Sequence, residues 1–217
     1  TSFIAASSSA GQSLQGLGDI GNYFPFDQGT TWVYQGTEQS GGQTTHYTNT
    51  IQITGIDVTS NGRTTTVFRE TNSDDPGVTS EDYLVKDNQA ITNYGTNDIT
   101  DFLTPQVIPY REYIFPLGIN SSFEAINKSG LSWPDEYGDL DRIPETMSLT
   151  ATVTVVGFED ITVPAGTYTN AAKIVANVTI SVILSADGAT VTETITSTEW
   201  YAPGVGLVKS VGVVQTT

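Results

Sequence analysis

Histidine occurs once in this chain, at position 46, so any histidine-based chemistry would have to use that residue. A Ser-His-Asp triad also needs a nucleophile, and the sequence contains no Gly-x-Ser-x-Gly turn to present one. One histidine and no cysteine leave too few nitrogen and sulfur ligands for a zinc site. His46 lies in the polar stretch Thr44–Tyr47, and we predict that it is an exposed strand residue.

Paired carboxylates could hydrolyse glycosides, and the chain has 24 acidic residues from which to form a pair. Glu193 and Glu199 share one face of a predicted strand. At ~3.3 Å per residue they are about 20 Å apart, whereas the two carboxyl groups of a glycosidase are separated by about 5–10 Å. A partner on another strand would revive this chemistry, but we predict solvent-exposed charges and a protein that is not an enzyme.

A calcium site is the one candidate for a cofactor. The segment from Pro134 to Asp141 concentrates four carboxylates around Gly138, and oxygen-rich flexible loops suit Ca²⁺. The candidate ligands are Asp135, Glu136, Asp139 and Asp141. The spacing is not that of an EF-hand loop, and a solubilising acidic loop is the alternative.

Three Asn-x-Ser/Thr sequons begin at Asn120, Asn127 and Asn177. They are candidate glycosylation sites if the host glycosylates surface proteins. Asn177 falls on the polar face of a predicted strand, which would leave it accessible.

The charge balance excludes several classes of partner. Eight basic and 24 acidic residues give a net charge of −16, which repels nucleic-acid phosphates.

The sequence has no run of eighteen apolar residues to span a bilayer as a helix. A chain that is acidic, free of cysteine and rich in Thr, Ser and Gly suits an exposed protein. We therefore expect an extracellular or cell-surface location, with the periplasm as the alternative.

Alternating polar and apolar residues predict that the protein is all-β. The pattern has a period of two from Thr146 to Val155 and from Ile174 to Leu184, and threonines alternate from Thr190 to Trp200. Asp187-Gly188 is a hairpin signal between the last two segments. We predict about ten mostly antiparallel strands in one large curved sheet, either an open barrel or sandwich-like.

The domain organisation follows from two segments that lack this alternation. Residues 1–22 are rich in Ser, Gly and Ala and are predicted as an extended N-terminal arm. Residues 23–217 are predicted as a single β domain, in which the proline-rich residues 100–145 form an irregular insertion or a cap. The apolar anchors of the arm are Phe3, Ile4, Leu14, Leu17 and Ile20.

Four segments resemble a family of secreted bacterial and archaeal proteins of unassigned function. They are YFPFDQGTTWVY (Tyr23–Tyr34), IFPLG (Ile114–Gly118), VPAGTY (Val163–Tyr168) and EWYAPGVGLVK (Glu199–Lys209). The resemblance implies a curved antiparallel sheet, similar to the open barrels of periplasmic lipoprotein carriers. It brings no catalytic residues to this chain.

Two functions remain open. The first is a self-assembling structural subunit of a filament or surface layer, whose partners are copies of itself. Its arm would add a strand to an open edge of a neighbouring subunit, although the arm could equally fold back on its own subunit. The second is a binding module for an apolar ligand, enclosed by the faces around Met147–Val155 and Ile174–Leu184. A packed face would indicate a scaffold and an empty pocket a carrier.

Overall fold

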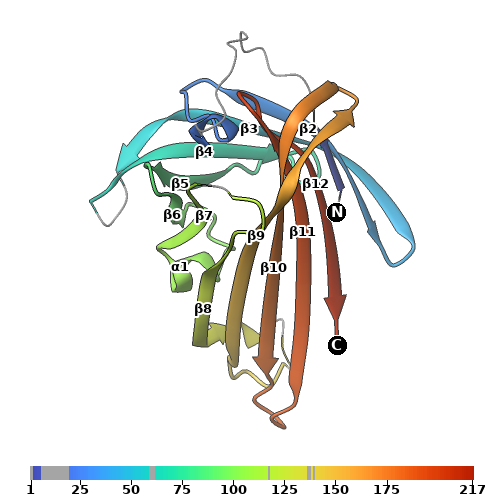
Figure 1. Cartoon of the computed structure of the whole chain (residues 1–217). Helices are drawn as coiled ribbons and strands as arrows, with labels where there is room; N and C mark the ends of the chain where they lie inside the picture. Colours follow the sequence, from blue (N-terminus) through green and yellow to red (C-terminus); the bar gives the residue numbers. More distant parts are fainter. Residues whose placement is uncertain (1, 6–19, 59–61, 117, 136–137, 139) are drawn as a thin grey trace.

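The computed structural model describes residues 2–5, 20–58, 62–116, 118–135, 138 and 140–217 (Figure 1). Its regular elements are twelve strands, one helical turn, α1 (Thr104–Val107), and one 3-10 turn, η1 (Ile20–Tyr23). The strands are β1 (Ser2–Ala5), β2 (Thr31–Ser40), β3 (Gln43–Val58), β4 (Thr64–Asn72), β5 (Ser80–Lys86), β6 (Ala90–Thr96), β7 (Tyr110–Ile114), β8 (Ser122–Trp133), β9 (Glu145–Val163), β10 (Gly166–Ile183), β11 (Thr190–Ala202) and β12 (Gly206–Thr216). The all-β prediction is confirmed.

Hydrogen bonds join the strands into one antiparallel sheet in the order β7-β6-β5-β4-β3-β2-β1-β12-β11-β10-β9-β8. Strands β2 to β7 curl into a half-barrel, and β8 to β12 form a second sheet whose long strands extend away from it (Figure 1). β1 lies between the two parts. The predicted large curved antiparallel sheet is therefore present.

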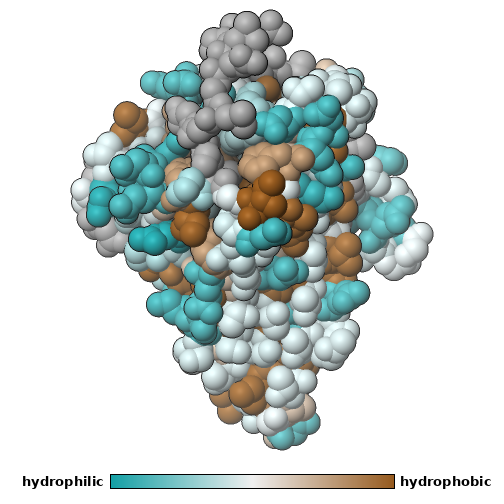
Figure 2. All heavy atoms as spheres, in the orientation of Figure 1, coloured by the Kyte–Doolittle hydropathy of each residue, from teal (hydrophilic) through white to brown (hydrophobic). Residues whose placement is uncertain are grey.

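Strand β9 shows why the second sheet forms. Met147, Leu149, Val153 and Val155 are buried, while the threonines between them are exposed or half-buried. This strict alternation gives the strand one wet face and one packed face. Figure 2 accordingly shows a mostly pale, weakly polar surface over the lower part of the molecule.

Glycines place two of the hairpins. Gly41 and Gly42 join β2 to β3 with φ of 57° and 79°, a pair of positive values that only glycine adopts readily and that matches the twist of a tight hairpin. Gly188, with φ of 71°, joins β10 to β11, and the side chain of Asp187 accepts a hydrogen bond from the Ala189 N–H at 2.8 Å. The predicted Asp-Gly hairpin is present.

Three clusters of buried side chains form the core. One joins the two parts of the sheet, because Leu84 and Ile91 of the half-barrel pack with Val153 and Ile174 of the second sheet. Another lies around Trp32 and extends across β2, β3, β11 and β12. The third fills the concave face of the second sheet, where Val107 of α1 covers aliphatic residues of β9 and β10.

Residues 100–145 cap that face and also add regular structure. The cap is formed by the segment containing α1, while β7 and β8 extend the two ends of the sheet. The prolines of this segment lie outside its strands, at positions 105, 109, 116, 134 and 144. Proline cannot donate to a strand ladder, so its positions mark strand ends rather than an irregular chain throughout.

Candidate functional site

The first candidate site is a slot between β2 and β12, which β1 fills. β1 pairs antiparallel with both neighbours, so that Phe3 lies opposite Gly36 on one side and Ser210 on the other. Four residues of β1 thereby connect a six-stranded half-barrel to a five-stranded sheet. In this structure of a single chain, the strand in the slot belongs to the same chain.

One end of the slot is tied by side chains from β2. The indole Nε1 of Trp32 donates to the Val205 carbonyl at 2.6 Å, and the Tyr34 hydroxyl donates to the Leu207 carbonyl at 3.1 Å. Both aromatic side chains are at least 95% buried, and burial raises the pKa of Tyr34. Because these two bonds connect β2 to β12 and to the turn that precedes it, the two edges are held together there without β1.

At the other end of the slot, β12 and β2 continue beyond the described pairing with β1. Pairing with β1 ends at Val211 on β12 and at Thr37 on β2, but β12 continues to Thr216 and β2 to Ser40. From Val213 to Thr216, β12 pairs with β11, and no other described strand lies on its second side. Val213 and Val214 are 52% and 57% exposed.

Gly36 makes close packing possible inside the slot. It lies opposite Tyr47 of β3, and the Tyr47 ring occupies the place that a Cβ atom at position 36 would take. Tyr47 is itself buried. An aromatic ring laid over a cross-strand glycine shields the bare backbone and fixes the register.

The second candidate site is an aromatic cavity of about 200 Å³ inside the half-barrel. Its lining combines residues from both parts of the sheet with the segment that precedes β2. The aromatic members are Phe24, Phe26, Trp32, Tyr34, Phe68, Tyr113 and Tyr201, and the remaining members are Pro25, Ile51, Leu84, Ile91, Glu112 and Leu207. Among these lining residues Glu112 is the only one with a charged side chain.

Tyr113 and Tyr201 line this cavity, and both of their hydroxyls bond to a carboxylate behind them. The hydroxyls of Tyr113 and Tyr201 lie 2.6 Å apart, and both donate to Glu199 Oε2, at 2.7 and 2.9 Å. The Phe24 ring packs 4.6 Å from each tyrosine ring, measured between centroids. Burial, together with the Glu199 charge, raises the pKa of both tyrosines well above the usual value, so their hydroxyls stay protonated donors.

Glu112 of β7 faces the same cavity from another side. Its Oε1 accepts a hydrogen bond from Asn93 Nδ2 at 3.0 Å. Burial raises its pKa to about 7, and the nearby carboxylates of Asp82 and Glu199 act in the same direction. Burial also raises the pKa of Asp82 to about 6. The ion pairs of the described residues are Arg69–Glu81 and Lys173–Glu159. Neither pair includes Asp82 or Glu112.

Two of the four predicted calcium ligands, Asp135 and Asp141, lie among the described residues. Glu136 and Asp139 lie outside the described residues. Asp141 uses its carboxylate within the protein, accepting hydrogen bonds from the Ile143 N–H at 2.8 Å and the Ser185 hydroxyl at 3.0 Å. In the described part of the chain no three acidic or histidine side chains group as metal ligands, and the calcium site stays a prediction.

The remaining predicted residues lie on the surface. Asn120, Asn127 and Asn177 are all exposed, as glycosylation would require. His46 is an exposed strand residue, as predicted, with Nδ1 3.3 Å from the Thr37 hydroxyl.

The arm anchors fall into three groups. Phe3 and Ile4 lie in β1, Ile20 begins η1, and Leu14 and Leu17 lie outside the described residues.

Glu199 corrects a sequence-based expectation. The sequence predicts an exposed strand charge, but Glu199 is half-buried and accepts two tyrosine hydroxyls. The neighbouring aromatic residues Trp200 and Tyr201 indicate in the sequence that this part of the strand is packed. The contact with Tyr113 cannot be predicted in the same way, because it depends on the folded position of β7 relative to β11. Glu112 had no sequence signal, because β7 is a short strand without a clear alternation.

Part of the chain is similar to a family of known proteins. Residues 142–211 match the family model described as DUF3108-like, a family of unknown function. The matched segment covers most of β9 to β12, that is, most of the second sheet. Neither a curated protein nor a solved structure matches the chain. No described helix has the length and apolar character needed to cross a membrane.

Proposed function

We propose that this protein is a structural subunit of an extracellular or cell-surface filament or layer, and that it assembles by donating β1 to the slot of a neighbouring copy. The observation that carries this proposal is the slot itself: a short strand lies between two long edges that the rest of the fold already holds in position. A strand with the same sequence from another subunit would make the same backbone hydrogen bonds.

The slot does not depend on β1 for its shape. The Trp32 and Tyr34 hydrogen bonds tie its closed end, and the cluster that contains Leu84 and Ile174 fixes the half-barrel against the second sheet. Because the slot is preformed, little conformational entropy is lost when a donated strand binds in it, and this favours a high affinity.

The concave face of the second sheet supports a scaffold over a carrier. Met147, Leu149, Ile180 and Val182 on this face are buried, and Val107 of α1 packs against them. This is the face that an apolar ligand would have to occupy in a carrier with an open barrel. The aromatic cavity of the half-barrel does not lie on this face, since none of its described lining residues belongs to β9 or β10.

Cysteine trapping tests strand donation directly, because the natural chain has no cysteine. Ser2 and Val211 lie opposite each other in the register of β1 and β12, at a spacing that a disulfide can bridge. Chains carrying only Ser2→Cys are refolded together with chains carrying only Val211→Cys, and are then oxidised. Donation between chains gives covalent dimers on a non-reducing gel.

The double variant Ser2→Cys, Val211→Cys gives the complementary result. Exchange between chains produces a covalent ladder, whereas pairing within one chain produces a cross-linked monomer and no ladder, which would overturn the proposal. Ser2→Cys combined with Ser197→Cys is the matched control, since Ser197 lies on β11, one strand further from β1. Light scattering with and without residues 1–22 adds the particle mass, which we expect to fall to that of a monomer.

A further inference from the structure

The aromatic cavity of the half-barrel has the composition of a site for a cation. We propose that it binds a small organic ammonium ion, with Glu112 as the counter-ion and the surrounding rings as the walls. This inference is argued separately from strand donation, because it rests on described lining residues between Phe24 and Leu207.

The walls offer rings rather than hydrogen-bonding atoms. Trp32 Nε1 and the Tyr34 hydroxyl are bonded to carbonyls of the chain at Val205 and Leu207. The hydroxyls of Tyr113 and Tyr201 are bonded to Glu199. What remains for a ligand is aromatic carbon surface, and such surfaces attract alkylated ammonium groups through the negative faces of the rings.

Glu112 supplies the one charged side chain among the described lining residues of the cavity. Its Oε1 accepts a hydrogen bond from the neutral amide of Asn93, and the ionisable groups that act on it from neighbouring strands are the acids Asp82 and Glu199. A carboxylate surrounded by rings and other acids is costly to ionise unless a cation accompanies it. The net charge of −16 attracts cations to the molecule as a whole.

Aromatic rings of this protein already accept ammonium groups at two places, one of them at the edge of the cavity. Lys86 Nζ lies 5.4 Å from the centroid of Phe26, a lining residue, and donates to the Phe24 carbonyl. On β11, Trp200 has Lys173 Nζ at 5.2 Å and Lys209 Nζ at 4.9 Å from its ring. The cavity has rings of the same kind but no lysine or arginine among its lining residues.

The volume limits the size of the ligand. At ~30 Å³ per water-sized group, about 200 Å³ holds roughly six or seven non-hydrogen atoms. Tetramethylammonium and choline are of this size, whereas a lipid chain is not. The cavity therefore suits a small quaternary amine rather than an apolar cargo.

The test compares two molecules of one shape that differ in charge. Binding of choline and of its neutral carbon analogue 3,3-dimethylbutan-1-ol to the full chain is measured by ligand-observed NMR titration. We expect choline to bind at least about tenfold more tightly, a difference of about 1.4 kcal/mol. Equal affinities, or no saturable choline binding, would overturn the proposal.

Three variants locate the site. Glu112→Gln keeps a hydrogen-bond partner for Asn93 and removes the charge, so it should lower choline affinity at least about tenfold and leave the neutral analogue unchanged. Glu124→Gln, on the exposed face of β8, is the matched control and should change neither. Ile51→Phe fills the cavity and should abolish binding of both molecules. Unchanged choline binding in Glu112→Gln or in Ile51→Phe would place the ligand elsewhere and overturn the assignment.

Discussion

The half-barrel and the second sheet bury different kinds of side chain although both are antiparallel. The second sheet packs aliphatic residues such as Met147 and Ile180 under α1 in a filled cluster. The half-barrel encloses aromatic rings, the carboxylates of Asp82 and Glu112, and a cavity. The difference predicts that the second sheet contributes more to the free energy of unfolding than the half-barrel does.

Truncation of the core should show this difference most strongly. Met147 is 1% exposed in the filled cluster, and we expect Met147→Ala to lower the free energy of unfolding by about 3–5 kcal/mol. Leu84 already borders the cavity, so Leu84→Ala loses fewer contacts, about 2 kcal/mol. Urea unfolding of both variants measures the difference. An equal loss at the two positions would remove the distinction between filled and cavity-lined packing.

The buried acids should make the half-barrel sensitive to pH. The pKa of Glu112 is raised to about 7 and that of Asp82 to about 6, above the ~4 expected in the unfolded chain. Between these values the folded protein holds more protons than the unfolded chain, so stability is present in mild acid and is lost as the pH rises toward 7. The free energy of unfolding is measured with urea at about pH 4.5 and about pH 7.5. We expect its fall between these two pH values to be roughly 2–3 kcal/mol smaller in Glu112→Gln than in the natural protein.

Asp87 provides a control of opposite sign. Hydrogen bonds from the backbone N–H groups of Gln89 and Ala90 lower the pKa of Asp87. Its contribution to stability is therefore present at neutral pH and is lost as the pH falls. Asp87→Asn should therefore reduce the loss of stability that occurs as the pH falls into the acid range. If it instead reduced the loss that occurs as the pH rises, as expected for Glu112→Gln, the lowered pKa of Asp87 would be contradicted.

A methyl group added at position 36, beside the slot, should destabilise the protein more than one added on an open strand surface. In Gly36→Ala the new Cβ meets the Tyr47 ring, and we expect a loss of about 1–3 kcal/mol because a buried ring has to move. Gly157 on β9 has no atom within 4 Å of a Cβ built on it, so Gly157→Ala should leave stability unchanged or slightly higher. Thermal unfolding compares the two variants.

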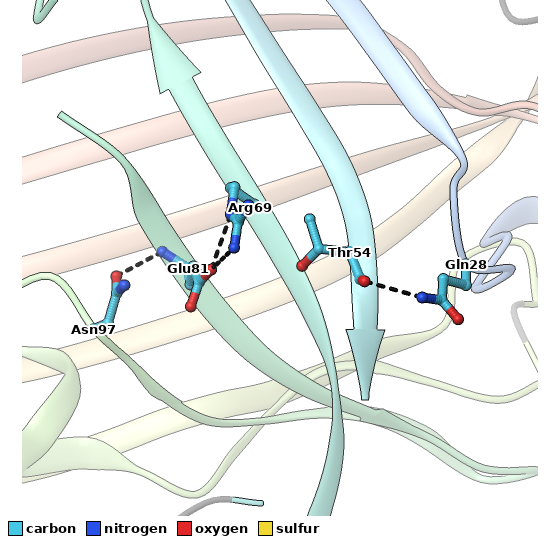
Figure 3. Close-up of polar contacts among 5 residues, drawn as sticks. All are labelled: Gln28, Thr54, Arg69, Glu81 and Asn97. Atoms are coloured by element: carbon cyan, nitrogen blue, oxygen red, sulfur yellow. Dashed lines mark hydrogen bonds and ion pairs between the residues drawn. The ribbon is translucent and has the colours of Figure 1, made fainter. Parts of the chain in front are cut away.

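The smallest effect is expected on the outer face of the half-barrel. Arg69 of β4 donates to Glu81 Oε1 of β5 from Nε and Nη2, at 2.9 and 2.7 Å (Figure 3). The Glu81 N–H donates in turn to the side-chain oxygen of Asn97. Nearby, the Gln28 side chain donates to the Thr54 carbonyl, separately from this pair. The Arg69 side chain is 49% exposed, so Arg69→Gln should cost ~0.2–1 kcal/mol. A loss as large as that of Met147→Ala would show that this surface pair matters more than its exposure indicates.

The second sheet could be predicted far better than the half-barrel. The period of two in β9 and β10 directly reflects one wet and one packed face, and the Asp187-Gly188 turn identifies the hairpin that follows. Two long strands with a clear pattern leave little freedom in their pairing.

The half-barrel depends on contacts that no local pattern encodes. Tyr113 reaches Glu199 across 86 positions of the chain, and β1 is a strand of four residues in a segment of low complexity. The aromatic residues near Trp32 and Trp200 indicated packing, but the carboxylates among them were visible only once the strands had curled together.

The position of β1 also has a consequence for the order in which the sheet forms. Ile4 and Lys209 are paired across about two hundred positions of the chain, whereas the neighbouring hairpins join strands that are close in sequence. Closing so large a loop costs more chain entropy than closing a hairpin, and such long-range pairings form slowly. The pairing of β1 is therefore expected to be the latest step in forming the sheet. Under the strand donation proposed above, it is the step at which a chain's own strand would compete with that of another copy.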